Sequence, residues 1–255
     1  MARSQNDVVD DQFGPRASAY VESTVHASGE DLDALEAIVR RKAPRQAIDL
    51  GTGGGHVAYR LAPHAGCVTA VDLSAAMIAA VAETAHRRGF ANIRTAVSPA
   101  ESLPFEDASF DFLGCRFSAH HWRDFEAGLR EARRILEPGS SAVFIDAISP
   151  AAAALDTHLQ AIELLRDPSH VRDYTSSEWG AALVGAGFIV QQTKRRRLRM
   201  DYPTWIERMR TPPAHQAAIR SLQANVSAET SAYFEIEAAD GSFMLDVLQI
   251  EAVAV

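Results

Sequence analysis

Residues 46–55 of this chain read QAIDLGTGGG, and this short segment constrains the fold more than any other. An apolar strand runs into a turn with four glycines, and a helical stretch from about His56 to Leu61 follows. Glycine permits positive φ angles, and its missing Cβ lets a ligand lie against the backbone. The N–H groups of the loop and of the helix start favour a polar or anionic group. The segment therefore predicts a nucleotide-like cofactor at the end of a buried parallel strand.

The spacing of the glycines bears on which cofactor binds. The dinucleotide-binding fingerprint has a glycine or alanine at its sixth position, where this chain has His56. Asp49 stands two residues before the first glycine, and a second acid, Asp72, follows the apolar stretch 67–71, about twenty residues beyond the turn. An acidic side chain at the end of a second strand hydrogen-bonds ribose hydroxyls, in NAD enzymes and elsewhere. The pattern predicts a cofactor that contains ribose.

Strands and helices alternate from residue 46 to about residue 148. Phe125, Leu129, Ala132 and Leu136 have helical spacing, and Pro138-Gly139 is expected to form a turn. This alternation predicts an α/β fold with a Rossmann-like, doubly wound parallel sheet. The expected strands are 47–50, 67–71, 93–97, 110–116 and 142–148, and the expected helices are 56–62, 75–88 and 124–136.

The flanking segments extend this core. Residues 30–42 have the apolar spacing of a helix, and a further helix is expected at 176–185. Two strands, from Phe188 to about Leu198 and from Gly241 to Val253, are expected to pair as an antiparallel edge. We expect a single domain over 1–255, with its core in 30–150, 176–198 and 240–255 and helical lid insertions in 1–28, 151–175 and 199–235.

The composition excludes several classes of protein. The chain has 255 residues, of which 47% are hydrophobic and 23% are charged, as in ordinary globular proteins. Its net charge of −8 argues against a nucleic-acid partner, which needs a broad basic face. No apolar run approaches the ~20 residues of a membrane span, and the first residues lack an apolar signal region, so a cytoplasmic location is expected. Cys67 and Cys115 are expected to be buried free thiols.

A third motif, PAESLPFEDASFDFLGCRFSAHHW, spans residues 99–122. Together with QAIDLGTGGG and AVDLS, it resembles the class I S-adenosylmethionine-dependent methyltransferases, and most of all the branch of the ubiquinone and menaquinone C-methyltransferases (methyltransferase type 11). The resemblance covers about residues 46–148. It implies a seven-stranded sheet with an antiparallel last strand, S-adenosyl-L-methionine at the carboxyl ends of the strands, and methyl transfer to a small molecule.

The resemblance also implies cofactor-binding residues. It places the backbone of Gly51 to Gly53 beside the methionine part of the cofactor, with Asp49 and Thr52 near its amino group. Asp72 matches the acid that binds both ribose hydroxyls. The other matching positions are Leu73 and Met77 beside the adenine, Ala100 and Glu101 at the adenine edge, and Arg116 to Ser118 under the sulfonium. Pro99 stands where members often have an aspartate that accepts a hydrogen bond from the adenine amino group.

The segment His120-His121-Trp122 is the most informative candidate on the acceptor side. No carboxylate or cysteine stands at a recognisable metal-ligand spacing, so no metal site is expected. Either histidine is a candidate to position the acceptor or to remove its proton, because imidazole titrates near neutral pH; one of them as a core residue is the alternative. Trp122, Tyr20, Tyr202 and Trp205 are candidates for an aromatic wall around the acceptor, or else for ordinary packing.

The basic run from Lys194 to Arg197, continued by Arg199, has two interpretations. It fits a solvated edge strand, where charge discourages edge-to-edge pairing, or an anchor for an anionic substrate. The sequence also leaves open two other functions, an NAD-dependent oxidoreductase and an inactive cofactor-binding interaction module. No motif shows whether the chain forms a homodimer.

Overall fold

Seven strands form one mixed sheet in the order β3-β2-β1-β4-β5-β7-β6. The structure, a computed structural model, describes residues 3–17 and 29–255. The strands are β1 (Gln46–Leu50), β2 (Cys67–Asp72), β3 (Ile93–Val97), β4 (Phe110–Arg116), β5 (Leu136–Ile148), β6 (Phe188–Met200) and β7 (Phe243–Ala254).

The directions of the strands confirm the expected fold class. Strands β1 to β5 run parallel, whereas β7 pairs antiparallel with both β5 and β6. The chain builds outward from β1 to β3 on one side, then returns to place β4 next to β1. In open α/β sheets, ligands bind beyond the carboxyl ends of the strands at such a switch point. The glycine loop follows β1 at this position.

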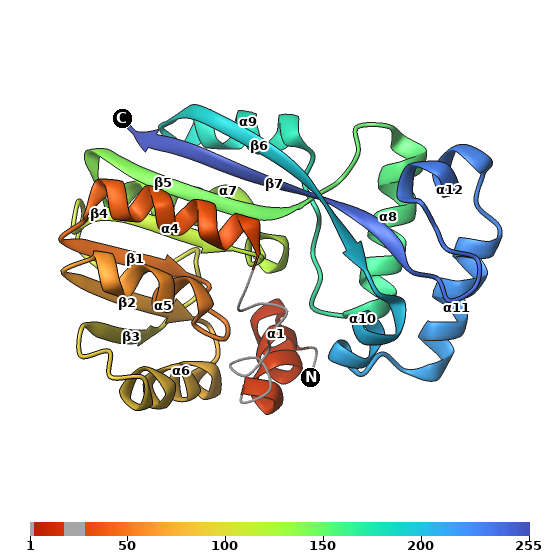
Figure 1. Cartoon of the computed structure of the whole chain (residues 1–255), viewed down its shortest axis with the longest axis horizontal. Helices are drawn as coiled ribbons and strands as arrows, with labels where there is room; N and C mark the ends of the chain where they lie inside the picture. The colour runs from red at the N-terminus through yellow and green to blue at the C-terminus, as the bar shows by residue number, and fades with distance from the viewer. Residues whose placement is uncertain (1–2, 18–28) are drawn as a thin grey trace.

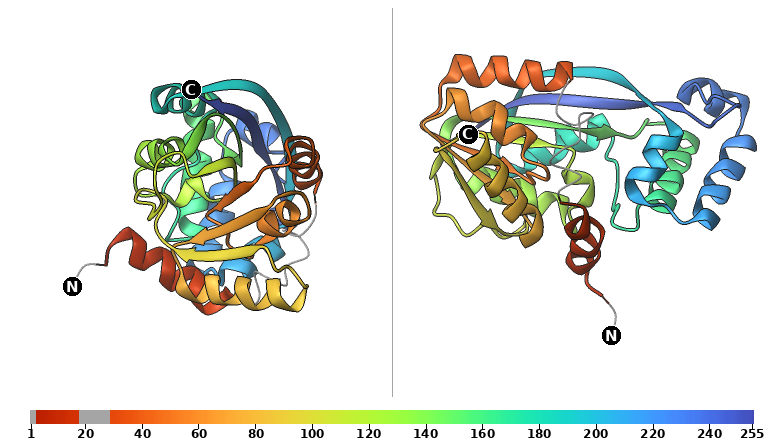
Figure 2. Two further views of the ribbon diagram at one scale, coloured as in Figure 1. Left: turned by 90° about the vertical axis from the view of Figure 1, so that its left-hand side faces the viewer. Right: turned by 60° about the horizontal axis from the view of Figure 1, so that its bottom comes forward.

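Helices cover both faces of the sheet (Figures 1 and 2). One face packs against α4, α5 and α6 and buries Ala47, and the other packs against α7 and α9 and buries Ile48. Neighbouring strand residues point to opposite faces, so a strand covered on both sides is apolar throughout. The helices of these two layers are α4 (Glu30–Lys42), α5 (His56–Leu61), α6 (Ala75–Arg87), α7 (Phe125–Arg134) and α9 (Ser176–Ala186).

Strands β6 and β7 continue past the end of β5 into a second group of helices (Figure 1). We call this group the acceptor lobe, after the role that we propose for it below. Its own apolar core contains Leu159, Trp205, Ile219, Phe234 and Phe243. The lobe contains α8 (Ala153–Arg166), α10 (Tyr202–Met209), α11 (Pro213–Ala224) and α12 (Ala228–Phe234). These helices fall within the segments that we expected to form a lid, and whether they open and close stays a prediction.

Helix α1 (Gln5–Phe13) belongs to the expected N-terminal lid segment. Its Ser4 cap accepts a hydrogen bond from the backbone of Asp7, whose side chain in turn accepts one from the Ser4 backbone. The side chain of Gln5 donates to the backbone oxygen of Ser169 at 2.7 Å. These contacts join α1 to the loop that follows α8.

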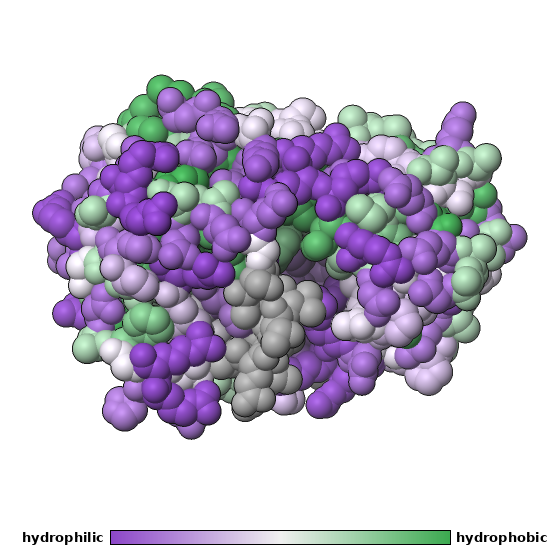
Figure 3. All heavy atoms as spheres, viewed as in Figure 1, coloured by the Kyte–Doolittle hydropathy of each residue, from purple (hydrophilic) through white to green (hydrophobic). Residues whose placement is uncertain are grey.

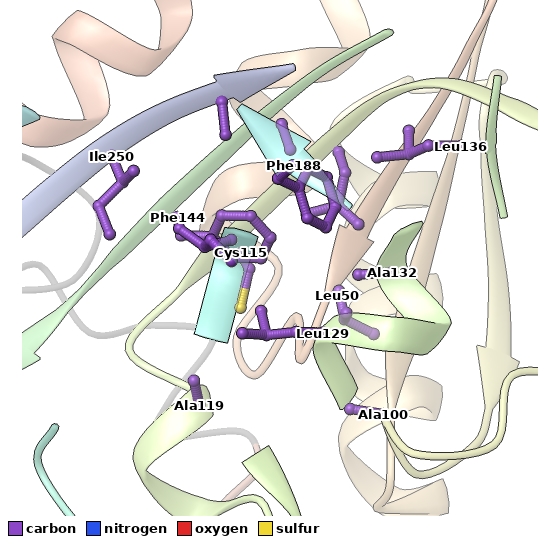
Figure 4. Packing of buried hydrophobic residues seen from close by; sticks show 14 of the residues in the cluster. Leu50, Ala100, Cys115, Ala119, Leu129, Ala132, Leu136, Phe144, Phe188 and Ile250 are labelled. Atoms are coloured by element: carbon purple, nitrogen blue, oxygen red, sulfur yellow. The ribbon is translucent and has the colours of Figure 1, made fainter. Parts of the chain in front are cut away.

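Three local expectations are corrected. Leu136 does not end the helix but begins β5 opposite Phe110, and Pro138-Gly139 lies inside that strand, where the register with β4 shifts. Such an irregularity accommodates a proline, which cannot donate to the sheet. Cys67 is only partly buried, whereas Cys115 is buried as expected. Figure 4 shows Cys115 within the apolar cluster of the α7 face, near Leu129 and Phe144.

Candidate active site

A cavity of about 650 Å³ lies at the carboxyl ends of the parallel strands and extends to the acceptor lobe. Its lining includes Leu50 and Asp72 from the sheet and Trp205 and Met209 from the lobe. Figure 3 shows a hollow between these two parts of the molecule, with hydrophobic atoms beside it and hydrophilic atoms around it. One cavity therefore joins the glycine loop to the acceptor lobe.

The glycine loop has the backbone conformation that its sequence predicts. Gly51 and Gly53 have φ angles of +71° and +48°, in the left-handed region that favours glycine. A Cβ on Gly51 would lie 1.8 Å from the Oγ of Ser118. A Cβ on Gly53 would meet no heavy atom within 4 Å, and this residue lines the cavity. The loop thus leaves open space directly beside its backbone.

Asp72 lies at the end of β2 and lines the cavity. Its carboxylate accepts hydrogen bonds from the backbone N–H of Gly53 at 2.8 Å and of Ser74 at 3.0 Å. Burial raises the pKa of this carboxyl. The two bonds fix the carboxylate at the edge of the open space beside Gly53.

The other residues that the resemblance assigns to the adenine side lie in the same part of the cavity. Leu73, Met77, Ala100 and Glu101 all belong to its lining. Met77 and Ala100 are buried apolar groups. The Glu101 carboxylate accepts a hydrogen bond from the backbone of Asp124 at 3.1 Å, so one of its oxygens supports the start of α7.

Asp49 and Thr52 do not belong to the cavity lining. Asp49 is fully buried, and its Oδ2 accepts bonds from the Thr52 hydroxyl at 2.5 Å and from the Ala58 N–H at 2.8 Å. Burial raises the pKa of Asp49 to about 7. In this structure the two side chains bind the glycine loop to the start of α5.

Strand β4 ends in residues that bend toward the cavity. Arg116 donates from Nε to Asp31 at 2.5 Å, and its guanidinium lies 4.6 Å from the centre of the Phe117 ring. Phe117 has a φ of +49°, a costly conformation for an aromatic residue. The Oγ of Ser118 accepts a bond from the indole N–H of Trp122 at 3.0 Å. All four of these β4-end residues, Arg116, Phe117, Ser118 and Trp122, line the cavity.

His120 forms a buried pair with Asp146, which follows the apolar run of β5. Nδ1 of His120 lies 2.6 Å from Oδ1 of Asp146, whose Oδ2 accepts the backbone N–H of Ala119 at 2.9 Å. Burial by itself lowers the pKa of an imidazole, but the Asp146 carboxylate outweighs it and raises the pKa of His120 to about 9. His120 lines the cavity, and its Nε2 has no hydrogen-bond partner among the residues that the structure describes.

His121 has the opposite electrostatic character. Burial, and then the charge of His120, lower the pKa of His121 to about 4. Its Nδ1 lies 3.2 Å from the backbone oxygen of Ser169, and the Phe13 ring packs edge-on against it at 5.0 Å. Nearby, His170 is kept neutral because burial and the two other imidazoles lower its pKa. His121 is thus a neutral, packed side chain at neutral pH.

The aromatic candidates separate into two groups. Trp122 and Trp205 line the cavity. Tyr202 lies in the core of the acceptor lobe, donates its hydroxyl to the backbone of Gln216 at 3.0 Å, and is not among the lining residues. Tyr20 lies outside the described residues. Ordinary packing, the alternative we gave for these residues, describes Tyr202.

Several residues that line the cavity were not predicted from the sequence. Phe13 comes from α1, Glu163 and Arg166 from α8, and Asp173 from the loop before α9. Arg166 pairs with Glu163 at 3.2 Å and donates to the backbone oxygen of Trp205 at 3.1 Å. Burial, and then the Glu163 carboxylate, raise the pKa of Asp173 to about 8, and its Oδ2 has no partner in the described part of the chain.

Two other properties concern the described residues only. Within residues 3–17 and 29–255, no cluster of three histidine, cysteine, aspartate or glutamate side chains is arranged to hold a metal ion. The helices of the same ranges include none with the length and apolar character of a membrane span.

Comparison with known proteins shows which family this fold belongs to. A family model described as a methyltransferase domain matches residues 48–144. YafE, an uncharacterised protein of Escherichia coli K12, is 42% identical over 202 residues, which are 79% of this chain and 97% of that protein. YcgJ, an uncharacterised methyltransferase of Bacillus subtilis, is 33% identical over 207 residues, or 81% of this chain and 82% of that protein.

The crystal structure of YcgJ superimposes with a TM-score of 0.85 at 30% identity, covering 88% of this chain and 97% of that one. The ubiquinone/menaquinone biosynthesis C-methyltransferase UbiE of Brucella anthropi is 32% identical over 142 residues, 52% of this chain and 54% of that protein. The fold and these similarities define a class I methyltransferase. The chain belongs to the S-adenosylmethionine-dependent methyltransferase family, and its cofactor is S-adenosylmethionine. The oxidoreductase and the inactive module, which the sequence had left open, are both replaced by this assignment.

Proposed function

We propose that this methyltransferase acts on a small-molecule acceptor that binds in the cavity between the glycine loop and the acceptor lobe. The continuity of one cavity carries the proposal: Gly53 and Asp72 line one end, and His120 and Trp205 line the other. A methyl donor at the first end and an acceptor at the second would meet inside this one cavity. Holding two reactants in this way lowers the barrier by orientation alone.

The residues at the glycine loop fit the cofactor. S-adenosylmethionine supplies a methyl group on a positively charged sulfur. The open space beside Gly53 would take the methionine part of the cofactor, and Asp72 would accept hydrogen bonds from the ribose hydroxyls. Leu73 and Met77 would pack against the adenine. Asp49 and Thr52 would act on the shape of the loop, because their side chains bind each other.

We propose that His120 removes the proton of the acceptor. Asp146 holds its Nδ1, so the ring presents Nε2 to the cavity. An acceptor hydroxyl or carbon acid must lose a proton as it gains the methyl group, and neutral His120 would take that proton at Nε2. His121 would serve as a packed neighbour, since its Nδ1 faces the Ser169 backbone. Apolar side chains of Phe13, Trp122 and Trp205 would exclude water.

Two measurements test this function in sequence. Isothermal titration calorimetry with S-adenosylmethionine and with NAD should show binding of the first alone. The protein is then incubated with labelled methyl donor and a whole cell extract, the extract is fractionated afterwards, and the labelled product is identified by mass spectrometry. Asp146→Asn should bind the donor normally and label the same product more slowly above pH 9, where His120 of the parent is also neutral but is still held by Asp146. Label that appears only in protein or nucleic acid would contradict a small-molecule acceptor.

A further inference from the structure

The basic residues of β6 do not all point to the same face of the strand. Arg195, Arg197 and Arg199 alternate along the strand and therefore point to the same face. Each has an acidic or phenolic partner on a neighbouring segment, so their charge is neutralised locally. The partners are Asp246 and the Tyr233 hydroxyl for Arg195, Glu235 for Arg197, and Glu237 for Arg199. This face matches the solvated edge strand that the sequence suggested.

Arg196 points the other way. It stands directly opposite Val247 in the pairing of β6 with β7, and residues opposite each other in an antiparallel pair point to one face. Both residues line the cavity. Only 13% of the Arg196 side chain is exposed. Arg197 and Arg199 also line the cavity, but their side chains are 37% and 49% exposed, so Arg196 is more deeply buried than either.

The guanidinium of Arg196 has no hydrogen bond in the described part of the chain. Its Nε, Nη1 and Nη2 atoms are all buried and without a hydrogen-bond partner. The nearest carboxylate is that of Glu30, whose Oε2 lies 3.9 Å from Nε on a side chain that is 84% exposed. A buried charge that makes no hydrogen bonds is unfavourable. A ligand that supplies an anion would satisfy it.

The sheet order separates Arg196 from the cofactor end. The glycine loop follows β1, and β6 lies four strands away in the order β1-β4-β5-β7-β6. At about 4.8 Å per strand, the two backbones are roughly 19 Å apart along the sheet. Arg116 on β4 is much nearer to the loop. Arg196 therefore faces the acceptor part of the cavity.

We propose that Arg196 binds a single carboxylate on an acceptor whose body is apolar. One planar guanidinium donates two parallel hydrogen bonds to one carboxylate. The apolar body would lie against Met200, Leu245 and Val247, which line the cavity beside it. Four other arginines of the lining each pair with an acidic side chain, so we infer a site for one anion and not for a polyanion; they are Arg116, Arg166, Arg197 and Arg199. This inference rests on the proposed function, because it names the class of acceptor.

The test uses two probes of nearly equal shape, 2-naphthoate and its neutral amide, 2-naphthamide. Both are titrated by calorimetry into the full chain saturated with S-adenosylhomocysteine. The variant is Arg196→Met, and the matched control is Lys194→Met, which removes the same charge from an exposed residue of the same strand. We expect Arg196→Met to weaken 2-naphthoate by about tenfold or more, as for loss of a charge-assisted pair. It should change 2-naphthamide binding by less than about twofold, while Lys194→Met changes neither.

Thermal unfolding checks that the variant folds. Arg196→Met should match or exceed the melting temperature of the parent, because it removes a buried charge without hydrogen bonds. Equal 2-naphthoate affinity in parent and Arg196→Met would overturn the inference, as would weaker binding of S-adenosylhomocysteine, which would assign Arg196 to the cofactor. Tighter binding of 2-naphthyl phosphate than of 2-naphthoate would overturn the choice of a carboxylate as the group that Arg196 binds. If the parent fails to bind S-adenosylhomocysteine, the proposed function fails instead.

Discussion

The two ends of the cavity, to which we assign the cofactor and the acceptor, are built in different ways. At the cofactor end, backbone groups dominate: the Gly53 N–H binds Asp72, and left-handed glycines create the space. At the acceptor end, side chains from separate segments meet, as when His120 of the β4 end binds Asp146 of β5. Backbone geometry is preserved by a few glycines, whereas a set of side chains changes with each substitution. In our assignment, substitutions would therefore change the acceptor more readily than the cofactor.

The largest effect should come from the acceptor end. His120→Ala is expected to lower kcat by about 10²–10⁴, the usual contribution of a general base, and to leave S-adenosylmethionine affinity unchanged. Single-turnover methyl transfer with the identified acceptor measures the first, and calorimetry measures the second. His86→Ala, an exposed histidine on α6, is the control. An unchanged rate in His120→Ala would mean that orientation alone carries the reaction.

At the cofactor end, a single carboxylate should matter most. Asp72→Ala is expected to weaken S-adenosylmethionine by about 2–3 kcal/mol, because charge-assisted hydrogen bonds to the ribose are lost. Asp72→Asn should lose less, since its amide oxygen still accepts a bond. Calorimetry compares the three proteins. Parent-like affinity of Asp72→Ala would refute the ribose assignment, and a slower chemical step with unchanged affinity would move Asp72 to the acceptor side of the comparison.

The pH dependence of the rate separates the ends further. Because the pKa of His120 is about 9, its neutral form is scarce at pH 7 and increases with pH. The rate of methyl transfer to a neutral hydroxyl acceptor should rise about tenfold per pH unit between pH 7 and 8 and level off above pH 9. Asp146, Asp173 and Glu163 hold the proton on His120, and neutral His121 lies beside it. Asp146→Asn should therefore shift the profile to lower pH. A flat profile in the parent would count against base catalysis.

The smallest effect compares two glycines. Gly53 and Gly89 have φ angles of +48° and +78°, and a Cβ on either would meet no atom within 4 Å. Each alanine variant should lose about 1–2 kcal/mol of stability, the cost of a left-handed alanine. Only Gly53→Ala should also weaken S-adenosylmethionine, because Gly53 alone of the two lines the cavity. Denaturant unfolding and calorimetry give the two readouts, and equal cofactor affinity in both variants would remove Gly53 from the site.

The sequence predicted the cofactor end of the cavity better than the acceptor end. The parallel core was predictable because its periodicity, glycines and helix caps are local signals, and Asp72 followed from its place at a strand end. We did not predict Asp146: it is the one acid in the otherwise apolar run 142–148, and its partner depends on how β4 lies beside β5. The depth of Arg196 depends on β7 and on the end of α4, which no local pattern describes. Leu136 was misplaced because helical spacing does not show where a helix ends, and the two interpretations of Tyr202 could not be separated without knowing its neighbours.

Met200 at the end of β6 and Phe243 at the start of β7 pair directly across the sheet edge. The whole excursion that carries α10, α11 and α12, residues 201–242, thus leaves and rejoins the molecule at two points that are about 5 Å apart. A short hairpin turn would close the same gap. The excursion is in this sense one contiguous insertion whose two ends are fixed by a single cross-strand pair. Because Trp205 and Ile219 share a core with Leu159 of α8, a replacement would have to supply side chains that cover α8.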